Sequence, residues 1–471
     1  MTETTMSAKA TSPNASSATR PARPKTAAER AIIDVFSRSS ASLPGSGWVA
    51  KVRGDAIAWL DEHGLPTRRV EAFKYTDLRE RIKEAWAPVS GPSAELSIAQ
   101  LDAALGPLAA LDGPRVVFVD GVFNPALSRE SDFGEAVEQM PLAPLLRKAP
   151  AWLEGKFAAG RLGQASAMTT LNTAFMSDGL MIKVKPGQAL AKPVLVVSVR
   201  ASAEPATVAT RNVVAMEAGS SLTMIEAHVA VAGAASKGIV SSLTDVTVAD
   251  GASLVHIQCA IDGSDASHLS NVVATVGADA NYRVFQLTAG PLLARNDLLV
   301  DMSGSGSKLD ISGAFLARGT AHGDTTLVVD HKVPHCESRE LFKCVLADRA
   351  RGVFQGKVVV RPGADKTDGK QMARALLLSE DAEFDSKPEL EIYADDVACG
   401  HGATAAALDE NLIFYCLSRG IPENEARALL IEAFIGEAIE KVEHDAVREA
   451  LMEIARQWLS HGDGLAAESA T

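Results

Sequence analysis

The feature that most constrains the fold is a turn that recurs at nearly constant spacing through the middle of the chain. Five glycine turns lie 26 to 32 residues apart, each between two β-rich stretches: Pro186-Gly187, Ala218-Gly219-Ser220, Asp250-Gly251-Ala252, Val276-Gly277-Ala278 and Ser305-Gly306-Ser307. Pro362-Gly363-Ala364 is a later turn of the same kind. Such a period is typical of a solenoid, in which each coil shares its core with its neighbours.

The segments between these turns indicate strands. Runs such as 194–199 and 246–248 are rich in valine, which favours β structure. Aromatic residues make up only 5% of the 471 residues, so small aliphatic side chains must fill the interior. Thin stacked layers suit that composition, and we expect a parallel β-helix. A β-sandwich with regularly spaced turns remains the alternative on pattern alone.

Helical patterns lie on both sides of the repeats. Ala27 to Arg38 and Gly47 to His63 have helical spacing, and Val116 to Phe123 predicts a short hairpin. The last sixty or so residues return to helix, with Asp409 as an N-cap and Gly420 as the residue that ends that helix. Because the ends of a solenoid expose backbone edges, we expect these helical regions to cap it.

The predicted organisation has four parts. They are a disordered tail over 1–29, a mostly helical N-terminal region with a short hairpin over 30–155, a parallel β-helix core over 156–405 and a C-terminal helical region over 406–471. The tail is rich in Ser, Thr, Ala and Pro and lacks the apolar segment of a secretory signal.

Charge and cysteine usage exclude several classes. The net charge of −13 argues against a nucleic-acid-binding face, which needs clustered Lys and Arg. No apolar run approaches the ~20 residues of a membrane span. The five cysteines are odd in number and include no CxxC pair, so we expect reduced thiols in a cytoplasmic protein rather than disulfides or a zinc ribbon.

No motif indicates a self-contained enzyme. The stretch from Gly363 to Gln371 resembles a phosphate-binding loop, but it is one residue too long and has Gln where a magnesium-binding hydroxyl is needed. The adjacent carboxylates Asp395 and Asp396 would point to opposite faces of a strand, which suits an acid/base pair poorly. We expect a protein without catalytic activity.

Two groups of imidazole and thiol side chains could bind iron or sulfur. His331, His335 and Cys336 form the first, and Cys399 and His401 the second. In a strand, Cys399 and His401 would share a face, roughly 7 Å apart. A buried cysteine beside a hydrogen-bonded histidine is the structural alternative for either group.

Several segments resemble motifs of the SufB/SufD family of iron–sulfur cluster assembly proteins. They are Glu71–Leu78, with Phe73 where Trp is common, Arg349–Gly356, Pro388–Ile392, Ala394–Thr404 and Ile413–Ile421. The likeness is strong over residues 331 to 436 and weaker over 65 to 330. The stretch from Gln371 to Leu378 lacks the cysteine of the SufB branch, so the chain resembles the SufD branch.

This resemblance implies a right-handed parallel β-helix that serves as a scaffold subunit. It implies pairing with SufB through the β-helix, and docking of the ATPase SufC through the C-terminal helices. It also implies a transient iron–sulfur cluster shared with SufB, with no stably bound cofactor. A flavin in the complex and a homodimer of the isolated chain stay open.

The resemblance also implies roles for particular residues. His401 would be a ligand of the nascent cluster, together with a cysteine of SufB, whereas the part of Cys399 is undecided and His335 and Cys336 would be structural or interface residues. The partner-binding residues of the C-terminal helices would be Asp409, Phe414, Tyr415, Arg419, Gly420 and Phe434. The competing interpretation is a β-helix enzyme that acts on polysaccharide, with Asp395, Asp396 and His401 as its acid/base set.

Overall fold

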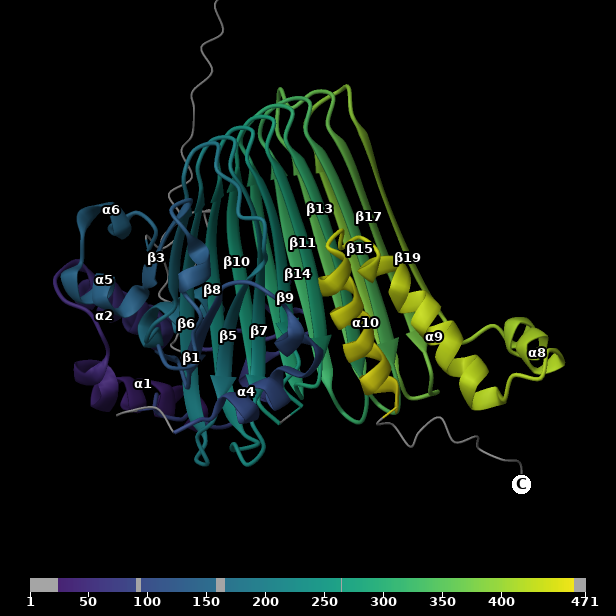
Figure 1. Cartoon of the computed structure of the whole chain (residues 1–471), viewed down its shortest axis with the longest axis horizontal. Helices are drawn as coiled ribbons and strands as arrows, with labels where there is room; N and C mark the ends of the chain where they lie inside the picture. Colours follow the sequence, from purple (N-terminus) through teal and green to yellow (C-terminus); the bar gives the residue numbers. More distant parts are fainter. Residues whose placement is uncertain (1–23, 90–94, 158–165, 264, 461–471) are drawn as a thin grey trace, which may run out of the picture.

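The computed structural model describes residues 24–89, 95–157, 166–263 and 265–460, and its core consists of two long sheets (Figure 1). Sheet A contains, in chain order, β3 (Val137–Pro141), β4 (Leu180–Val184), β6 (Ala206–Met216), β8 (Gly238–Val248), β10 (Ser267–Val276), β12 (Leu293–Met302), β14 (His322–His331), β16 (Arg351–Val360) and β18 (Glu383–Ile392). Sheet B contains β1 (Arg115–Val119), β2 (Val122–Phe123), β5 (Val194–Arg200), β7 (Ser221–Ala230), β9 (Ser253–Ala260), β11 (Asn281–Ala289), β13 (Lys308–Ala317), β15 (Glu337–Leu346), β17 (Asp368–Leu377) and β19 (Ala398–Ala406).

From β4 onward the chain alternates between the two sheets, one strand in each per coil. Between the first and last coils, each strand pairs in parallel with the strand one coil earlier and the strand one coil later, as β10 does with β8 and β12. The result is a parallel β-solenoid of about eight turns. The predicted β-helix is therefore confirmed, and a β-sandwich is excluded because its sheets would be antiparallel.

The recurring turns connect a sheet A strand to the next sheet B strand, and each contains a residue with positive φ. Gly187, Gly219 and Gly251 have φ values of 67°, 67° and 66°. The turn predicted at Gly277 has its positive φ two residues later, at Asp279 (51°). Another turn of the same series has His335 at this position (62°), so the spacing of glycines does not reveal that turn.

The space between the sheets is filled by aliphatic side chains that alternate with outward-facing ones along each strand. Val196, Leu254, Val272, Leu298 and Val329 belong to this inner core, and each is 4% exposed or less. The outer faces of both sheets are also apolar and are covered by helices. This double burial explains why nearly every residue of strands such as β5 and β8 is buried, whichever face it points to.

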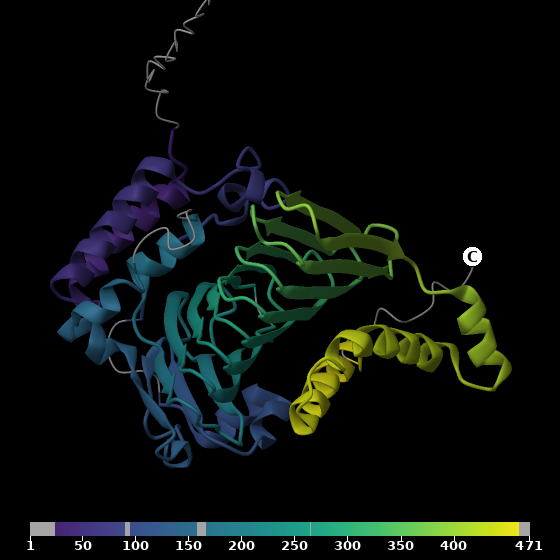
Figure 2. The ribbon, with the colours of Figure 1, turned by 90° about the horizontal axis from the view of Figure 1, so that it is seen from above.

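The helices lie on the two outer faces (Figure 2). On the N-terminal side they are α1 (Ala27–Ser39), η1 (Ser40–Ser42), α2 (Trp48–His63), η2 (Glu71–Phe73), α3 (Leu78–Arg81), α4 (Ile98–Leu105), η3 (Gly106–Ala110), η4 (Ser131–Phe133), α5 (Leu142–Lys148), α6 (Ala151–Glu154) and α7 (Ala167–Phe175). On the C-terminal side they are α8 (Glu410–Ser418), α9 (Glu423–Ile439) and α10 (Asp445–Ser460). α1, α2 and α7 pack on sheet A, whereas α4, α9 and α10 pack on sheet B. No described helix is long and apolar enough to cross a membrane.

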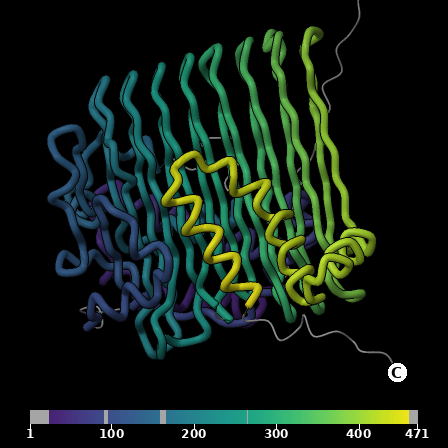
Figure 3. The backbone as a smooth tube through the Cα atoms, turned by 45° about the vertical axis from the view of Figure 1, so that its right-hand side comes forward, coloured from purple at the N-terminus to yellow at the C-terminus, as the bar shows by residue number. Residues whose placement is uncertain are grey.

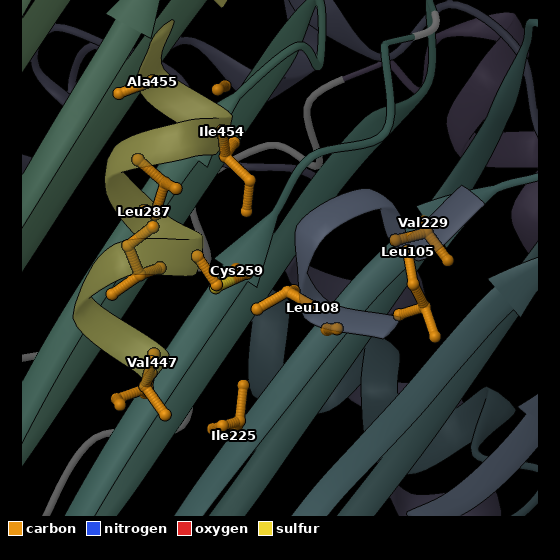
Figure 4. Packing of buried hydrophobic residues seen from close by; sticks show 14 of the residues in the cluster. Leu105, Leu108, Ile225, Val229, Cys259, Leu287, Val447, Ile454 and Ala455 are labelled. Atoms are coloured by element: carbon orange, nitrogen blue, oxygen red, sulfur yellow. The ribbon is translucent and has the colours of Figure 1, made fainter. Parts of the chain in front are cut away.

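The two ends of the solenoid differ. At the N-terminal end the predicted hairpin of β1 and β2 joins sheet B through β5, and β3 pairs antiparallel with β4. At the C-terminal end the expected helical cap is wrong, because α9 and α10 turn back across the outer face of sheet B (Figure 3). Figure 4 shows Val447 and Ile454 of α10 near Leu287 and Cys259 of that sheet. The apolar side of these helices finds a larger apolar surface there than at the last coil, whose strands are largely exposed.

The segment 71–78 anchors the N-terminal region to the outer face of sheet A. The hydroxyl of Thr76 donates to the buried carboxylate of Asp324 and lies 2.8 Å from Nε2 of His322. The guanidinium of Arg295 pairs with Asp324 and lies over the ring of Phe73, 4.3 Å from its centroid. Each buried charge is thus partnered, as burial requires.

The predicted domain boundaries can be set beside the elements. α1 begins at Ala27, so the last three residues of the predicted tail 1–29 are helical, and residues 1–23 lie outside the described part. The predicted start of the core at 156 precedes α7, whereas β4 begins at Leu180. The predicted end at 405 falls within the last strand, β19.

Candidate functional site at the open end of the solenoid

The last coil of the solenoid has unpaired edges. Among the described residues, β19 pairs only with β17, and β18 pairs only with β16. Every residue of β18 and β19 is at least partly exposed, whereas most residues of β15 are buried. An unpaired strand edge presents free N–H and C=O groups, so this end can accept a strand-rich surface of another chain.

Cys399 and His401 lie on β19 with one residue between them, so their side chains share a face as expected. The imidazole of His401 is exposed and makes no hydrogen bond to the described residues. Cys399 is half-buried beside Val358 and Leu390. Gly369 is its register partner on β17.

The two groups differ in chemical readiness. Burial raises the pKa of the Cys399 thiol, and the carboxylates of Asp368 and Glu340 add to that rise. The thiol therefore stays protonated near neutral pH until a metal or a cationic partner arrives. The imidazole of His401 is exposed, so an incoming group can reach it directly.

The first candidate group is dispersed by the fold. His335 is a turn residue whose backbone N–H donates to the carbonyl of Asp365 at 3.0 Å. Cys336 is fully buried, with its Sγ 3.3 Å from the Ser307 hydroxyl. His331 is also fully buried, and its Nε2 lies 3.1 Å from the Ser338 hydroxyl. These side chains stabilise the coil.

In the described part of the chain, no three His, Cys, Asp or Glu side chains are arranged to hold a metal ion. Cys399 and His401 thus have no third such ligand beside them among the described residues. All five cysteines are free, and burial raises the pKa of Cys259 and of Cys344 to about 12, so these two are inert core residues.

The carboxylates considered for an enzyme lie in the turn between β18 and β19. Asp396 pairs with the ammonium group of Lys366, and its carbonyl accepts from the Lys366 N–H at 2.6 Å. Asp396 is therefore part of the turn's own bonding. Asp395 is exposed in the same turn, outside both strands.

The helix predicted to begin after Asp409 is present as α8. The carboxylate of Asp409 accepts from the N–H of Asn411 at 2.9 Å, and Gly420 has a φ of 81°, so both ends form as expected. α8 projects from the body of the solenoid next to α9 (Figure 1). Ile413 is its one buried residue in the described structure, whereas Phe414 and Tyr415 are 72% and 56% exposed.

The remaining predicted partner residues divide between two places. Arg419 lies over the ring of Tyr415, 4.9 Å from its centroid, and so belongs to the exposed aromatic surface of α8. Phe434 lies on α9 and is partly buried, with the Nζ of Lys343 4.2 Å from its ring centroid. The fold thus groups Phe414, Tyr415 and Arg419 and separates Phe434 from them.

A row of side chains behind His401 was missed as a site by sequence reasoning. His401 pairs in register with Gln371 of β17, which pairs with Glu340 of β15. Gln371 and Glu340 are each 3% exposed. The signal that could have found Glu340 is a charged residue two positions before Phe342 in a strand whose alternate side chains face the core.

Taken together, the fold and this site define a β-solenoid protein whose last coil is open and carries a histidine and a cysteine. A family model described as the SUF system FeS cluster assembly, SufBD core domain, matches residues 199–434, and one described as the SufBD protein N-terminal region matches residues 26–196. The chain belongs to the SufB/SufD family of iron–sulfur cluster assembly proteins, and within it the chain is SufD-like.

Several relatives span most of the chain. The iron–sulfur cluster assembly protein SufD of Escherichia coli (strain K12) is 31% identical over 402 residues, which cover 85% of this chain and 90% of that protein. A SufBD family protein of Synechocystis is 30% identical and covers 83% of this chain and 86% of its own length. A chloroplastic protein of Arabidopsis thaliana, ABCI7, is 26% identical over 87% of this chain and 85% of its own length.

Proposed function

We propose that the chain is the non-ATPase scaffold subunit of a cytoplasmic SufBCD complex, in which it pairs with SufB and docks the ATPase SufC. In this role it carries no catalytic activity of its own. The observation that carries the proposal is the open end of the solenoid, where unpaired edges of β18 and β19 lie beside an exposed His401. The family supplies the identity of the partners.

The nascent iron–sulfur cluster is the cargo of this end, held transiently between two chains rather than kept as a resident cofactor. Its support is the chemistry of the face of β19, where an exposed imidazole and a half-buried thiol point the same way. Both are ligands that iron accepts. The lack of a complete ligand set in the described residues fits a site that a SufB cysteine completes.

The test is anaerobic cluster reconstitution in the complex of the chain with SufB and SufC. His401→Ala should leave the fold and assembly of the complex intact, because the ring is exposed, and should lower the cluster yield measured by absorption and Mössbauer spectroscopy. His63→Ala removes another exposed imidazole, on α2, and should have no effect. A normal cluster yield with His401→Ala would refute the ligand role. Cys399→Ser decides the part of the thiol.

SufC docking is proposed for α8 and the start of α9. The support is the exposed aromatic surface of Phe414 and Tyr415, which a monomeric chain has no packing reason to expose. Phe414→Ser should weaken capture of SufC without lowering the melting temperature, whereas Ile98→Ser, at an exposed apolar residue of α4, serves as the control. Capture of SufC by a chain truncated at Asp409 would contradict the proposal.

The same open end lets two copies of the chain associate when SufB is absent. Measurement of molecular mass with and without SufB and SufC separates this homodimer from the proposed complex. In the proposal, added SufB replaces the second copy, because both compete for the edges of β18 and β19.

A further inference from the structure

The interior of the solenoid contains two buried glutamates, and they differ in their surroundings. Glu226 on β7 shows how a structural carboxylate is held. It accepts hydrogen bonds from Thr244 at 2.6 Å, from Asn212 at 3.2 Å and from Gln258 at 3.2 Å, and it pairs with His256 at 3.1 Å. This carboxylate is fully satisfied, as burial of a charge requires.

Glu340 on β15 has none of these partners. It is 3% exposed, and neither of its carboxyl oxygens has a hydrogen-bond partner of good geometry among the described residues, although the Ser338 hydroxyl is close enough to oppose the rise in its pKa. Its side chain faces the interior, because Phe342, two residues on, belongs to the inner core. An unpartnered buried carboxyl is costly to keep, so its presence calls for an explanation.

The neighbouring side chains also leave acceptor atoms free. Gln371 directs its Nε2 at the carbonyls of Gly356 (3.3 Å) and Glu389 (3.4 Å) in sheet A, which leaves its buried Oε1 without a donor. The reverse amide orientation would oppose oxygens to oxygens, so this one is favoured. Gly356 makes room for the amide, since a Cβ there would lie 2.0 Å from the Gln371 Oε1.

A third acceptor lies at the same end of the interior. The Nε2 of His331 lies 3.1 Å from the Ser338 hydroxyl, and its Nδ1 is buried without a partner. Burial lowers the pKa of His331 to about 4, so the ring is neutral, and Nδ1 is a bare acceptor in the tautomer whose Nε2–H donates to the Ser338 hydroxyl. Ser338 precedes Glu340 by two residues and faces the interior with it.

The free atoms around Glu340 are acceptors, and no described cation on the inner face would balance its carboxylate, so the carboxyl keeps its proton until a bound cation displaces it. A divalent cation matches this set, because carboxylate and amide oxygens are hard ligands for Mn²⁺, Mg²⁺ and similar ions. We propose that Glu340 and the Oε1 of Gln371 form a binding site for a hard divalent cation inside the open end of the solenoid. Water completes the shell, as it does in sites with one carboxylate.

This inference deepens the proposed function and rests on it only for the identity of the cation in the cell, ferrous iron. The register places Glu340 two strands behind His401, with Gln371 between them. An incoming ion could therefore bind first at the imidazole of His401 and then at the oxygen ligands of Glu340 and Gln371 behind it. Few protein ligands mean weak binding, which suits an ion that must be passed on.

The test is titration of the full chain with Mn²⁺, with free ion followed by electron paramagnetic resonance. We expect one bound ion per chain. Glu340→Gln keeps the shape and removes the charge, and it should weaken binding by roughly tenfold or more. Glu337→Gln, an exposed carboxylate on the same strand, should leave binding unchanged. Circular dichroism melting of each variant checks that it is folded.

The outcomes separate this inference from the proposed function. Equal Mn²⁺ affinity of wild type and Glu340→Gln overturns the cation site, whatever the complex does. Mn²⁺ binding that depends on Glu340, together with a complex that forms no cluster, keeps the cation site and overturns the proposed function. A Glu340→Gln chain that melts well below wild type also counts against the inference, because it would assign Glu340 a structural role.

Discussion

Lys343 of β15 and Glu437 of α9 form an ion pair beneath the helix that covers sheet B. The side chain of Lys343 is 1% exposed and points outward from the sheet, and the ring of Phe434 lies over its ammonium group. Burial lowers the pKa of Lys343, whereas the hydrogen bond from Lys343 lowers the pKa of Glu437. The pair fixes α9 at one position on the solenoid.

Loss of that carboxylate should loosen the C-terminal helices. Glu437→Gln leaves the buried ammonium group of Lys343 without its charged partner, so we expect a loss of about 1–2 kcal/mol in the free energy of unfolding. Glu440→Gln, one residue past the end of α9, should change it little. Urea unfolding measures both. An equal effect of the two substitutions would show that the pair contributes nothing specific.

The pH dependence of stability should carry a contribution from Glu340. Burial raises the pKa of this carboxyl to about 8, with Ser338 and Arg339 opposing the rise. Between its ordinary pKa of 4.5 and about 8, the folded protein keeps a proton that the unfolded chain releases. This contribution to stability is therefore full below pH 4.5 and is lost as the pH rises through 8. Glu340→Gln should flatten the decline measured by chemical denaturation between pH 5 and 8 without added metal, and an unchanged slope would contradict the shift.

Replacement of His335 by glycine should stabilise the protein. Its φ of 62° lies in the left-handed region, where a residue with a Cβ costs about 1 kcal/mol more than glycine. His335→Gly should therefore raise the melting temperature and leave cluster formation unchanged. The matched change in the next coil, Gly363→Ala at a φ of 81° and with open space around the new Cβ, should lower it by a similar amount. A fall in cluster yield with His335→Gly would instead indicate that His335 is a ligand of the nascent cluster.

Thr76 should be the most sensitive residue of the segment 71–78. Thr76→Val removes the hydroxyl that donates to Asp324 and approaches His322, so two buried polar groups lose a partner. We expect a loss of about 1–3 kcal/mol. Thr67→Val, at a half-buried hydroxyl with one long contact of 3.4 Å to Arg69, is the control. Thermal unfolding followed by tryptophan fluorescence should separate the two.

Much of the architecture could be predicted because it is written in local spacing. Recurrent glycines at positive φ, such as Gly219 and Gly251, mark most coils, and the pattern of 423–442 marks a helix with one apolar side. His335 escaped because only the backbone conformation, not the residue type, reveals that turn. The expected C-terminal cap failed because helical spacing identifies an apolar side but not which surface it covers.

Less of the site could be predicted, for a related reason. Cys399 and His401 are two residues apart, so their shared face follows from strand geometry alone. Glu340, Gln371 and His401 meet only through the register of three strands in separate coils. Likewise, the pairing of Lys343 with Glu437 joins segments almost one hundred residues apart, and nothing in either segment indicates the other.

The open coil of β18 and β19 is the last part of the solenoid to be synthesised, because these strands come last in the chain. During synthesis the ribosome releases β1 to β5 first, so each later coil can pair with strands that are already formed. The edges of β18 and β19 emerge last, shortly before the helices that turn back over sheet B. During translation the unpaired strand edges therefore always belong to the newest coil. They reach their final position only when the coil that bears His401 has formed.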